Sequence, residues 1–363
     1  MNIAKWFKLK SQLLLEDFVL KKSAGRIYSV IGGPIFFQTV RAAIELGFFD
    51  VLQQVPGSTL EELRTRLKIE TQPLRILLLV LVYLGLVRKK GDRYWNTYAS
   101  RVCFCTDSPK NINHIVRWQH AINYAAMPYL LDSIVQYANK GLQVFPGDEP
   151  TLYERLAHDP ERERIFQQAM VQISRQANAH LADYLDLGGT KLLVDIGGGL
   201  GENVLRLVST WPHLRAGVFD LPSVCELAEK NFDGSPHRSR LSTYAGNCFA
   251  DPLPKGPDAF LLCHFATIWS KEKNLALLKK CHDSLPAGGR AIIFNMMQND
   301  SEDGPAGAAM GSPYFLCLAT GEGMLYTWRE YEGLMREAGF TSVRSHRLPM
   351  QHGLIVGTKE GRA

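Results

Sequence analysis

The spacing of hydrophobic positions changes near residue 190. Before that point, apolar residues recur at helical spacing, as they do over residues 36–52 (FFQTVRAAIELGFFDVL). After it, short apolar runs alternate with helical stretches, which predicts a parallel sheet with helices on both faces. The strand candidates are KLLVDIG, RAGVFDL, STYAGN, DAFLLCHF, RAIIFNMM, SVRSHRL and HGLIVGTK. The last two runs lie only a few residues apart, so they predict an antiparallel hairpin that closes the sheet.

The first hundred residues predict a small helical domain that ends in a hairpin. Ser58 and Glu61 have the spacing of a capping box, which would open a short helix. A second helix is predicted over residues 70–87, and the charged turn RKKGDRYWNT around Gly91 separates two short extended pieces. This order is that of a winged helix. Because the second helix is almost wholly apolar, we expect it to be buried and to suit a subunit interface better than a nucleic-acid groove.

These patterns divide the chain into three predicted parts. Residues 1–110 form a winged-helix dimerisation domain, and residues 111–187 form a helical segment that links the domains and covers the pocket. Residues 188–363 form an α/β domain with a Rossmann-like doubly wound sheet. The length of 363 residues and the apolar content of 46% suit ordinary globular domains of this kind.

Charge is concentrated at the N-terminus. The formal net charge is +5, and residues 1–26 hold six basic residues against Glu16 and Asp17, a balance of +4. The rest of the chain is nearly neutral and does not predict a nucleic-acid surface. Since the two acidic residues interrupt the apolar stretch, the segment predicts a solvated or membrane-surface amphipathic helix rather than a secretory signal.

Neither a membrane span nor a metal site is predicted. The longest apolar run, Ile76 to Val87, has twelve residues, against the roughly 20 that cross a bilayer. The seven cysteines are scattered, without the paired spacing of zinc ligands. Such a set is typical of reduced thiols, and we expect a cytoplasmic protein.

The strongest chemical signal is a glycine-rich turn within residues 192–207 (LLVDIGGGLGENVLRL). A strand is predicted to end at Asp195 and a helix to start near Glu202. The dinucleotide fingerprint G-x-G-x-x-G fails here, because Glu202 or Val204 stands where its third glycine belongs. An acidic residue before a G-x-G-x-G turn suits S-adenosylmethionine instead, since a carboxylate can order the cationic amino-acid end of that cofactor.

Two further strand ends extend this site. Asp220 ends the next strand, where a carboxylate can accept hydrogen bonds from both ribose hydroxyls. The third strand ends in the segment GNCF, residues 246–249, at the place where an adenine edge would lie. All of these positions are carboxyl ends of strands, where open α/β sheets bind ligands.

Together these motifs resemble those of the S-adenosylmethionine-dependent small-molecule methyltransferases typified by plant caffeate and bacterial antibiotic O-methyltransferases. FQQAMVQIS (166–174) resembles their F-x-x-A-M-x-x-x-S segment, VDIGGGLG their V-D-x-G-G-G-x-G, and GNCF their G-D-M-F. FDLP (219–222) resembles the end of their second strand, and DAFLLCHFATIWS resembles D-A-x-x-x-K-x-x-x-H-D-W-S. The motifs fall in order along nearly the whole chain, and the resemblance implies a homodimer formed through the N-terminal domain.

The resemblance also implies roles for individual residues. It places Gly197, Gly199 and Gly201 at the methionine end of the cofactor. The implied cofactor site comprises Ser174, Asp195, Gly197, Gly199, Gly201, Asp220, Leu221, Asn247, Cys248, Phe249 and Cys263. Phe166 and Met170 would line the acceptor pocket, although their spacing equally suits core residues of a helix. Further pocket candidates are Trp118, Tyr124, Tyr314 and Glu322.

The chain departs from the family at its catalytic positions. The histidine of the H-D-W triplet, which is the general base of the family, is replaced by Thr267. The glutamate at the end of the fifth strand is replaced by Asn295, and Leu325 stands at the second acidic position. Loss of all three together indicates that the chemistry has changed. Other candidate bases are His264, three residues before Thr267, and His120, although each could equally be an ordinary packed histidine.

A ring carbon activated by a hydroxyl can take the methyl group without a base beside the sulfonium. Relatives that methylate carbon, such as the bacteriochlorophyllide methyltransferases, resemble this chain in lacking the histidine. We therefore expect a methyltransferase of a small hydroxylated aromatic or natural-product precursor, with carbon slightly favoured as the target. One alternative is an O-methyltransferase with a displaced base. Another is an enzyme that binds S-adenosylmethionine for hydroxylase-like or pericyclase-like chemistry without methyl transfer.

Overall fold

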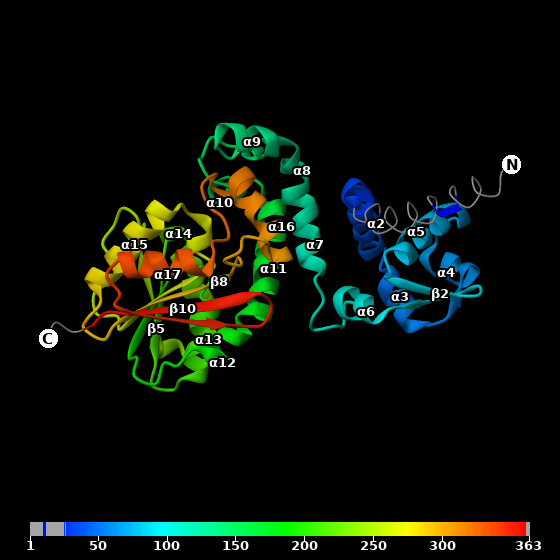
Figure 1. The fold of residues 1–363 in the computed structure, drawn as a ribbon. Helices are drawn as coiled ribbons and strands as arrows, with labels where there is room; N and C mark the ends of the chain where they lie inside the picture. The colour runs from blue at the N-terminus through cyan, green and yellow to red at the C-terminus, as the bar shows by residue number, and fades with distance from the viewer. Residues whose placement is uncertain (1–9, 12–24, 26, 361–363) are drawn as a thin grey trace. The chain divides into compact units, whose positions relative to one another are not determined.

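The computed structural model describes residues 10, 11, 25 and 27–360. These residues fold into two compact units, the first ending at residue 120 and the second beginning at residue 121 (Figure 1). The predicted amphipathic helix over residues 1–26 falls almost entirely outside the described residues. The three-part division of the chain, with boundaries after residues 110 and 187, stays a prediction. In the described part of the chain, no helix is long and apolar enough to cross a membrane.

Among its described residues, the first unit packs six helices and a small sheet around a core that includes Phe48, Phe49 and Leu52. The strands β2 and β3 pair antiparallel across the turn at Gly91, which confirms the predicted hairpin. The elements are α2 (Gly33–Glu45), α3 (Phe48–Gln54), β1 (Ser58–Thr59), α4 (Leu60–Leu67), α5 (Thr71–Tyr83), β2 (Val87–Lys90), β3 (Arg93–Asn96), α6 (Tyr98–Phe104) and α7 (Asn113–Trp118).

The predicted capping box is wrong by one residue. The Thr59 hydroxyl accepts from the Glu62 amide, and the Glu62 carboxylate accepts from the Thr59 amide, so Thr59 caps the N-terminus of α4. Ser58 belongs to β1 and donates its hydroxyl to the Val55 carbonyl at 2.6 Å. The neighbouring S-T and E-E pairs offer two registers, and the strand pairing of Ser58 with Tyr94 selects the second.

The expectation that the second helix is buried is correct for only one face of α5. Leu74 and Leu81 are fully buried, whereas Ile76, Leu79 and Tyr83 are exposed within this chain. A helix that is apolar all round has more apolar surface than one neighbouring layer can cover.

The second unit is built on a seven-stranded sheet in the order β6-β5-β4-β7-β8-β10-β9. The first five strands of this order are parallel, and β10 pairs antiparallel with β9, as predicted. The structure adds that β10 also pairs antiparallel with β8. The sheet consists of β4 (Leu192–Ile196), β5 (Arg215–Asp220), β6 (Leu241–Ala245), β7 (Ala259–Cys263), β8 (Arg290–Met296), β9 (Ser342–Arg347) and β10 (His352–Thr358).

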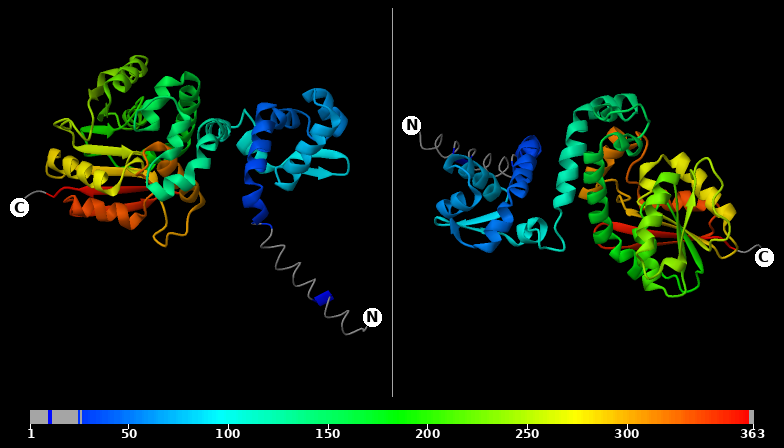
Figure 2. Two further views of the ribbon diagram at one scale, coloured as in Figure 1. Left: turned by 90° about the horizontal axis from the view of Figure 1, so that it is seen from above. Right: turned by 180° about the vertical axis from the view of Figure 1, so that it is seen from behind.

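Helices cover both faces of this sheet (Figures 1 and 2). Alternate residues of one strand enter different cores: Leu193 packs with α12 and α13, whereas Val194 packs with α15 and α17. This two-sided burial explains the continuous apolar runs of the strands. The helices of the unit are α8 (Tyr124–Ala126), α9 (Leu130–Gln136), α10 (Leu152–Arg155), α11 (Pro160–Ala177), α12 (Ala179–Tyr184), α13 (Glu202–Thr210), α14 (Pro222–Asp233), α15 (Lys271–Ser284), α16 (Ala306–Tyr314) and α17 (Trp328–Glu337).

Candidate functional site

The glycine turn between β4 and α13 lies at the carboxyl edge of the sheet. Gly197, Gly199 and Gly201 have φ angles of 69°, 56° and 80°, in the left-handed region that favours glycine. A Cβ atom on Gly197 would lie 2.2 Å from the Phe265 ring, and one on Gly201 would lie 2.4 Å from the Phe232 ring. The turn therefore needs glycine for its backbone conformation and, at Gly197 and Gly201, for close packing.

Asp220, the last residue of β5, lies against this turn. One of its carboxylate oxygens accepts from the Gly199 amide at 3.0 Å, and the other accepts from the Leu221 amide at 2.8 Å. Burial raises the pKa of Asp220, and the two backbone hydrogen bonds oppose that rise. The structure thus brings three of the predicted cofactor residues together at the carboxyl edge of the sheet.

Asp195, on β4, is completely buried beneath the turn. Its Oδ2 accepts a hydrogen bond from Asn203 Nδ2 at 3.0 Å, and its Oδ1 has no partner among the described residues. Burial raises the pKa of Asp195 to about 7, against the opposing effect of the Asn203 hydrogen bond. A buried carboxylate with an unpartnered oxygen, beneath a glycine turn, fits the cationic end of S-adenosylmethionine.

The predicted adenine side carries an aromatic cluster. The Phe249 ring lies 4.7 Å from that of Trp269 and 6.3 Å from that of Phe265, measured between centroids. Lys273 Nζ lies 4.8 Å from the centroid of the Trp269 ring. Asn247 accepts from the Phe249 amide at 2.9 Å, which closes the turn after β6. These rings offer apolar surface of the kind that a flat heterocycle needs.

Cys248 and Cys263, the two thiols predicted to lie beside the adenine, are held protonated by their surroundings. Burial raises the pKa of Cys248 to about 12 and that of Cys263 well above its usual value. They act as small apolar groups here rather than as nucleophiles.

His264 follows β7 at the same edge and has a left-handed φ of 53°. Its amide donates to the Phe294 carbonyl at 2.8 Å, and its Nε2 lies 3.3 Å from Asn178 Oδ1. Asn178 in turn donates to Asn203, the residue that holds Asp195. Burial lowers the pKa of His264 to about 3, with a smaller effect from His352, so the ring is neutral at physiological pH.

Thr267 and Asn295, the replacements for the family's base and its glutamate, are both buried. The Thr267 hydroxyl donates to the Met324 carbonyl at 2.9 Å, and Asn295 Nδ2 donates to the Tyr331 hydroxyl at 3.0 Å. Leu325, at the third position, is buried as well. None of the three can accept a proton at neutral pH, so their predicted catalytic role would be limited to positioning.

The acceptor-pocket candidates of the second unit are spread over several elements. Phe166 and Met170 lie along α11, which also carries the predicted cofactor residue Ser174, and the Phe166 ring is 6.0 Å from that of Tyr153. Tyr314 on α16 is buried, whereas Tyr124 on α8 is 41% exposed. The predicted roles of these side chains stay predictions.

Glu322 has a defined partner. Its Oε1 lies 2.5 Å from Lys273 Nζ, and it lines a pocket of about 550 Å³ with side chains of α9 and α16. The two remaining candidates, Trp118 and His120, belong to the first unit, where His120 Nδ1 lies 3.0 Å from Gln38 Nε2. Burial and the nearby Arg41 lower the pKa of His120.

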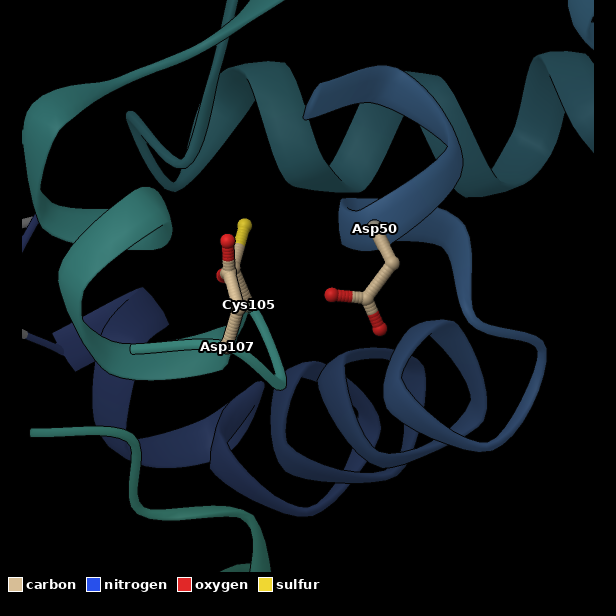
Figure 3. A group of neighbouring side chains, drawn as sticks. All are labelled: Asp50, Cys105 and Asp107. Atoms are coloured by element: carbon tan, nitrogen blue, oxygen red, sulfur yellow. The ribbon is translucent and has the colours of Figure 1, made fainter. Parts of the chain in front are cut away.

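Asp50, Cys105 and Asp107 form a group in the first unit whose ligand atoms lie within 4.8 Å of one another (Figure 3). The Asp50 carboxylate accepts from both the amide and the hydroxyl of Thr106, each at 2.7 Å. Burial raises the pKa of Cys105 to about 11, so the thiol stays protonated. These contacts explain the group as a turn held by Asp50, and we assign no metal to it.

Two groups at the cofactor turn, the fully buried Asp195 and the half-buried His264, affect stability with opposite dependence on pH. Asp195 has a raised pKa, so its favourable contribution is complete below about pH 4 and is lost as pH rises through about 7. His264 has a lowered pKa, so its contribution is complete above about pH 6.5 and is lost as pH falls towards about 3. The nearest charged or titratable neighbours are Asp220 and Cys263 for Asp195, and His352 for His264.

We therefore expect the D195N variant to gain stability relative to wild type as pH rises from 4.5 to 7.5, by about 2–3 kcal/mol. H264Q should change in the opposite direction. Urea unfolding of the cofactor-free protein at both pH values measures the difference, and H158Q, at an exposed pair with Glu149, is the control. An identical pH dependence for wild type, D195N and H264Q would show that neither group is buried as described.

Residues 28–106 match the O-methyltransferase dimerisation domain, and residues 129–341 match the O-methyltransferase domain. L-tyrosine C(3)-methyltransferase of Streptomyces lavendulae is 34% identical over 334 residues, 91% of each chain. 3-Hydroxy-5-methyl-1-naphthoate 3-O-methyltransferase of Streptomyces sahachiroi is 32% identical over 324 residues, which cover 89% of this chain and 91% of that enzyme's length.

A solved structure shares the fold and a similar degree of sequence identity. The S-adenosylmethionine-dependent methyltransferase SibL, in its apo form, superposes with a TM-score of 0.83 at 32% identity, over 93% of this chain and 99% of its own. The order of motifs, the glycine turn and these matches agree. The chain therefore belongs to the O-methyltransferase family, and it is an S-adenosylmethionine-dependent methyltransferase that acts on small molecules.

Proposed function

We propose that this enzyme methylates a ring carbon of a small hydroxylated aromatic acceptor, with hydroxylated aromatic amino acids as the leading class. The observation that carries the proposal is the chemistry at positions 267, 295 and 325. The Thr267 hydroxyl is engaged by Met324, the Asn295 amide is engaged by Tyr331, and Leu325 is apolar. A phenol that reacts through oxygen would find no base at these positions.

Carbon methylation places a different demand on the protein. When bound, S-adenosylmethionine supplies a methyl group on positively charged sulfur. The acceptor's hydroxyl must give up or share its proton, which increases the electron density of the ring carbons beside and opposite it. The ring carbon that gains the methyl group would then release its hydrogen as a proton to water, the base would return the first proton to the oxygen, and the aromatic ring would be restored. The base that takes the proton of the acceptor's hydroxyl can therefore lie beside that hydroxyl, away from the ring carbon that receives the methyl group.

His264 is the side chain that we assign to this hydroxyl. It is neutral, and its Nδ1 makes no hydrogen bond to a described residue, so this nitrogen can accept one from the acceptor. An imidazole with so low a pKa takes the whole proton only when negative charge lies near it. The carboxylate of an amino-acid acceptor would supply that charge, which favours this class of substrate.

The other residues bind and orient. The glycine turn would hold the methionine end of the cofactor, where Asp195 would stabilise the positive charge. Asp220 would accept hydrogen bonds from the ribose. The rings of Phe249, Phe265 and Trp269 would pack against the adenine. Fixing both reactants in this way can contribute up to roughly 7–11 kcal/mol. We also propose that the chain forms a homodimer through the dimerisation domain, residues 28–106.

The relatives support carbon and oxygen as targets. The Streptomyces lavendulae relative is named for methylation at C(3) of tyrosine, and the Streptomyces sahachiroi relative is named for methylation at oxygen. Oxygen is therefore the second candidate, and an assay must distinguish the two.

The test uses S-adenosylmethionine with a carbon-13 methyl group, incubated with L-tyrosine, hydroxylated tyrosines, catechols and hydroxyanthranilates. We expect an NMR signal from a methyl group on ring carbon, and no transfer to L-phenylalanine, which lacks the activating hydroxyl. A labelled methoxyl group would overturn the assignment to carbon. Cofactor binding by calorimetry without transfer to any of these acceptors would overturn the proposed class of substrate.

A further inference from the structure

We infer that Asp195, Asn203 and Asn178 fix the tautomer of His264, with the proton on Nε2 and the lone pair on Nδ1. The three residues are positioning residues, because they act through His264. The value of this arrangement for methyl transfer rests on the proposed function of His264. The tautomer itself does not, since it follows from the hydrogen bonds alone.

The direction of the chain of hydrogen bonds starts at Asp195. An ionised carboxylate only accepts, so Asn203 must present its NH₂ group to Asp195 Oδ2, where the two atoms are 3.0 Å apart. The Asn203 carbonyl oxygen then faces away from Asp195. It accepts a hydrogen bond from Asn178 Nδ2.

The same reasoning continues to the imidazole. Because the Asn178 amide nitrogen donates to Asn203, its Oδ1 is the atom left to face His264. Asn178 Oδ1 lies 3.3 Å from His264 Nε2, and a carbonyl oxygen can only accept. His264 must therefore carry its proton on Nε2, and in the neutral ring Nδ1 holds the lone pair.

Packing holds the ring in this orientation. The His264 backbone is fixed by its hydrogen bond to the Phe294 carbonyl, and its ring meets those of Phe294 and His352 edge to face, at 5.3 Å and 5.1 Å between centroids. His352 Nδ1 lies 2.8 Å from the Met350 carbonyl and must donate to it. Burial lowers the pKa of His352, so its ring is neutral, its Nε2 holds the lone pair, and it offers His264 no competing proton.

The arrangement joins the cofactor turn to the candidate base. Asp195 lies on β4 beneath the turn, and Asn203 lies in the first turn of α13, two residues after the last glycine. Asn178 joins α11 to α12, and α11 also carries the predicted pocket residues. The Asp195 carboxylate therefore determines which ring nitrogen of His264 can accept a hydrogen bond. It does so through the side-chain amides of Asn203 and Asn178, whose orientations it fixes.

The test is solid-state NMR of the sedimented full-length protein, free of cofactor, with histidine labelled by ¹⁵N and ¹³C. Ring nitrogen shifts distinguish the two tautomers, and the difference from H264Q identifies the His264 signals among the ten histidines. At pH 8, above the pKa of Asp195, we expect His264 in the Nε2–H form. N203L breaks the chain of hydrogen bonds between Asp195 and His264, and D195N removes the carboxylate that sets the direction of these hydrogen bonds. Each variant should give both His264 tautomers in comparable amounts.

N139L is the matched control, because the Asn139 amide donates to the Pro150 carbonyl outside this chain of hydrogen bonds. It should leave the His264 signals unchanged. A wild-type His264 with its proton on Nδ1 would overturn the inference, and this result needs no variant to fold. A folded N203L with an unchanged tautomer would overturn it too. If instead the tautomer is as expected but H264Q transfers methyl normally, the proposed function of His264 fails and the inference stands.

Discussion

Replacing Gly197 by alanine should weaken the binding of S-adenosylmethionine by about 100-fold or more, whereas G199A should weaken it by about 10-fold or less. Both residues have a left-handed backbone, so both variants carry a strain of about 1–2 kcal/mol. They differ in what the added Cβ atom meets. At Gly197 it would lie 2.2 Å from the Phe265 ring, and at Gly199 nothing lies within 4 Å.

Isothermal calorimetry with S-adenosylmethionine measures the two affinities, and thermal unfolding separates loss of affinity from loss of fold. G201A serves as a second comparison. Its Cβ would lie 2.4 Å from the Phe232 ring, which is buried in the core, so we expect G201A to lose thermal stability more than G197A does. Equal affinities for G197A and G199A would show that the Phe265 ring moves away easily and does not shape the site.

The sheet could be predicted from the sequence because its strands are buried on both faces. Runs such as LLVDI and AFLLC are almost continuously apolar, and each is followed by a turn or a helical stretch. All seven predicted strands are present, and the antiparallel hairpin lies where the short spacing of the last two runs places it. Local pattern and tertiary burial agree in this part of the chain.

The detail of the first unit was less predictable. Adjacent S-T and E-E pairs allow two capping boxes, and the pairing of Ser58 with Tyr94 on a strand 36 residues later decides between them. Likewise, the sequence of a helix that is apolar on all sides, such as α5, does not show which of its faces packs against the core. Both outcomes depend on contacts that are distant in sequence.

The polar residues around His264 were missed for a similar reason. Asn178, Asn203 and His352 come from the end of α11, from α13 and from β10, and nothing in their spacing joins them. Asn203 carried the one available signal, since it stands two residues after the last glycine of the turn. His264 was a candidate only because of its distance from Thr267, whereas the structure supplies its hydrogen-bond partner and its neutral state.

The H264Q variant should lower the rate of methyl transfer by about 10²–10⁴-fold, the usual contribution of a positioned base. Glutamine keeps an N–H group that can donate to Asn178 Oδ1, so the contact on that side survives. It lacks the basic nitrogen that we assign to the acceptor's hydroxyl. Rates under saturating cofactor and acceptor measure the effect, and the affinity for S-adenosylmethionine should change less than threefold, a loss of under about 1 kcal/mol.

The pH profile makes this prediction more specific than a loss of activity. If His264 relays the hydroxyl proton, the remaining rate of H264Q should rise with pH towards the pKa of a phenol, near 10, because the acceptor must then ionise by itself. The H158Q control should keep the wild-type rate and profile, since His158 pairs with Glu149 at the surface. A wild-type rate in H264Q would remove His264 from the reaction. A low rate with an unchanged pH profile would mean that His264 positions the acceptor without taking its proton, and the search for the base would then turn to the acceptor's own ionisation.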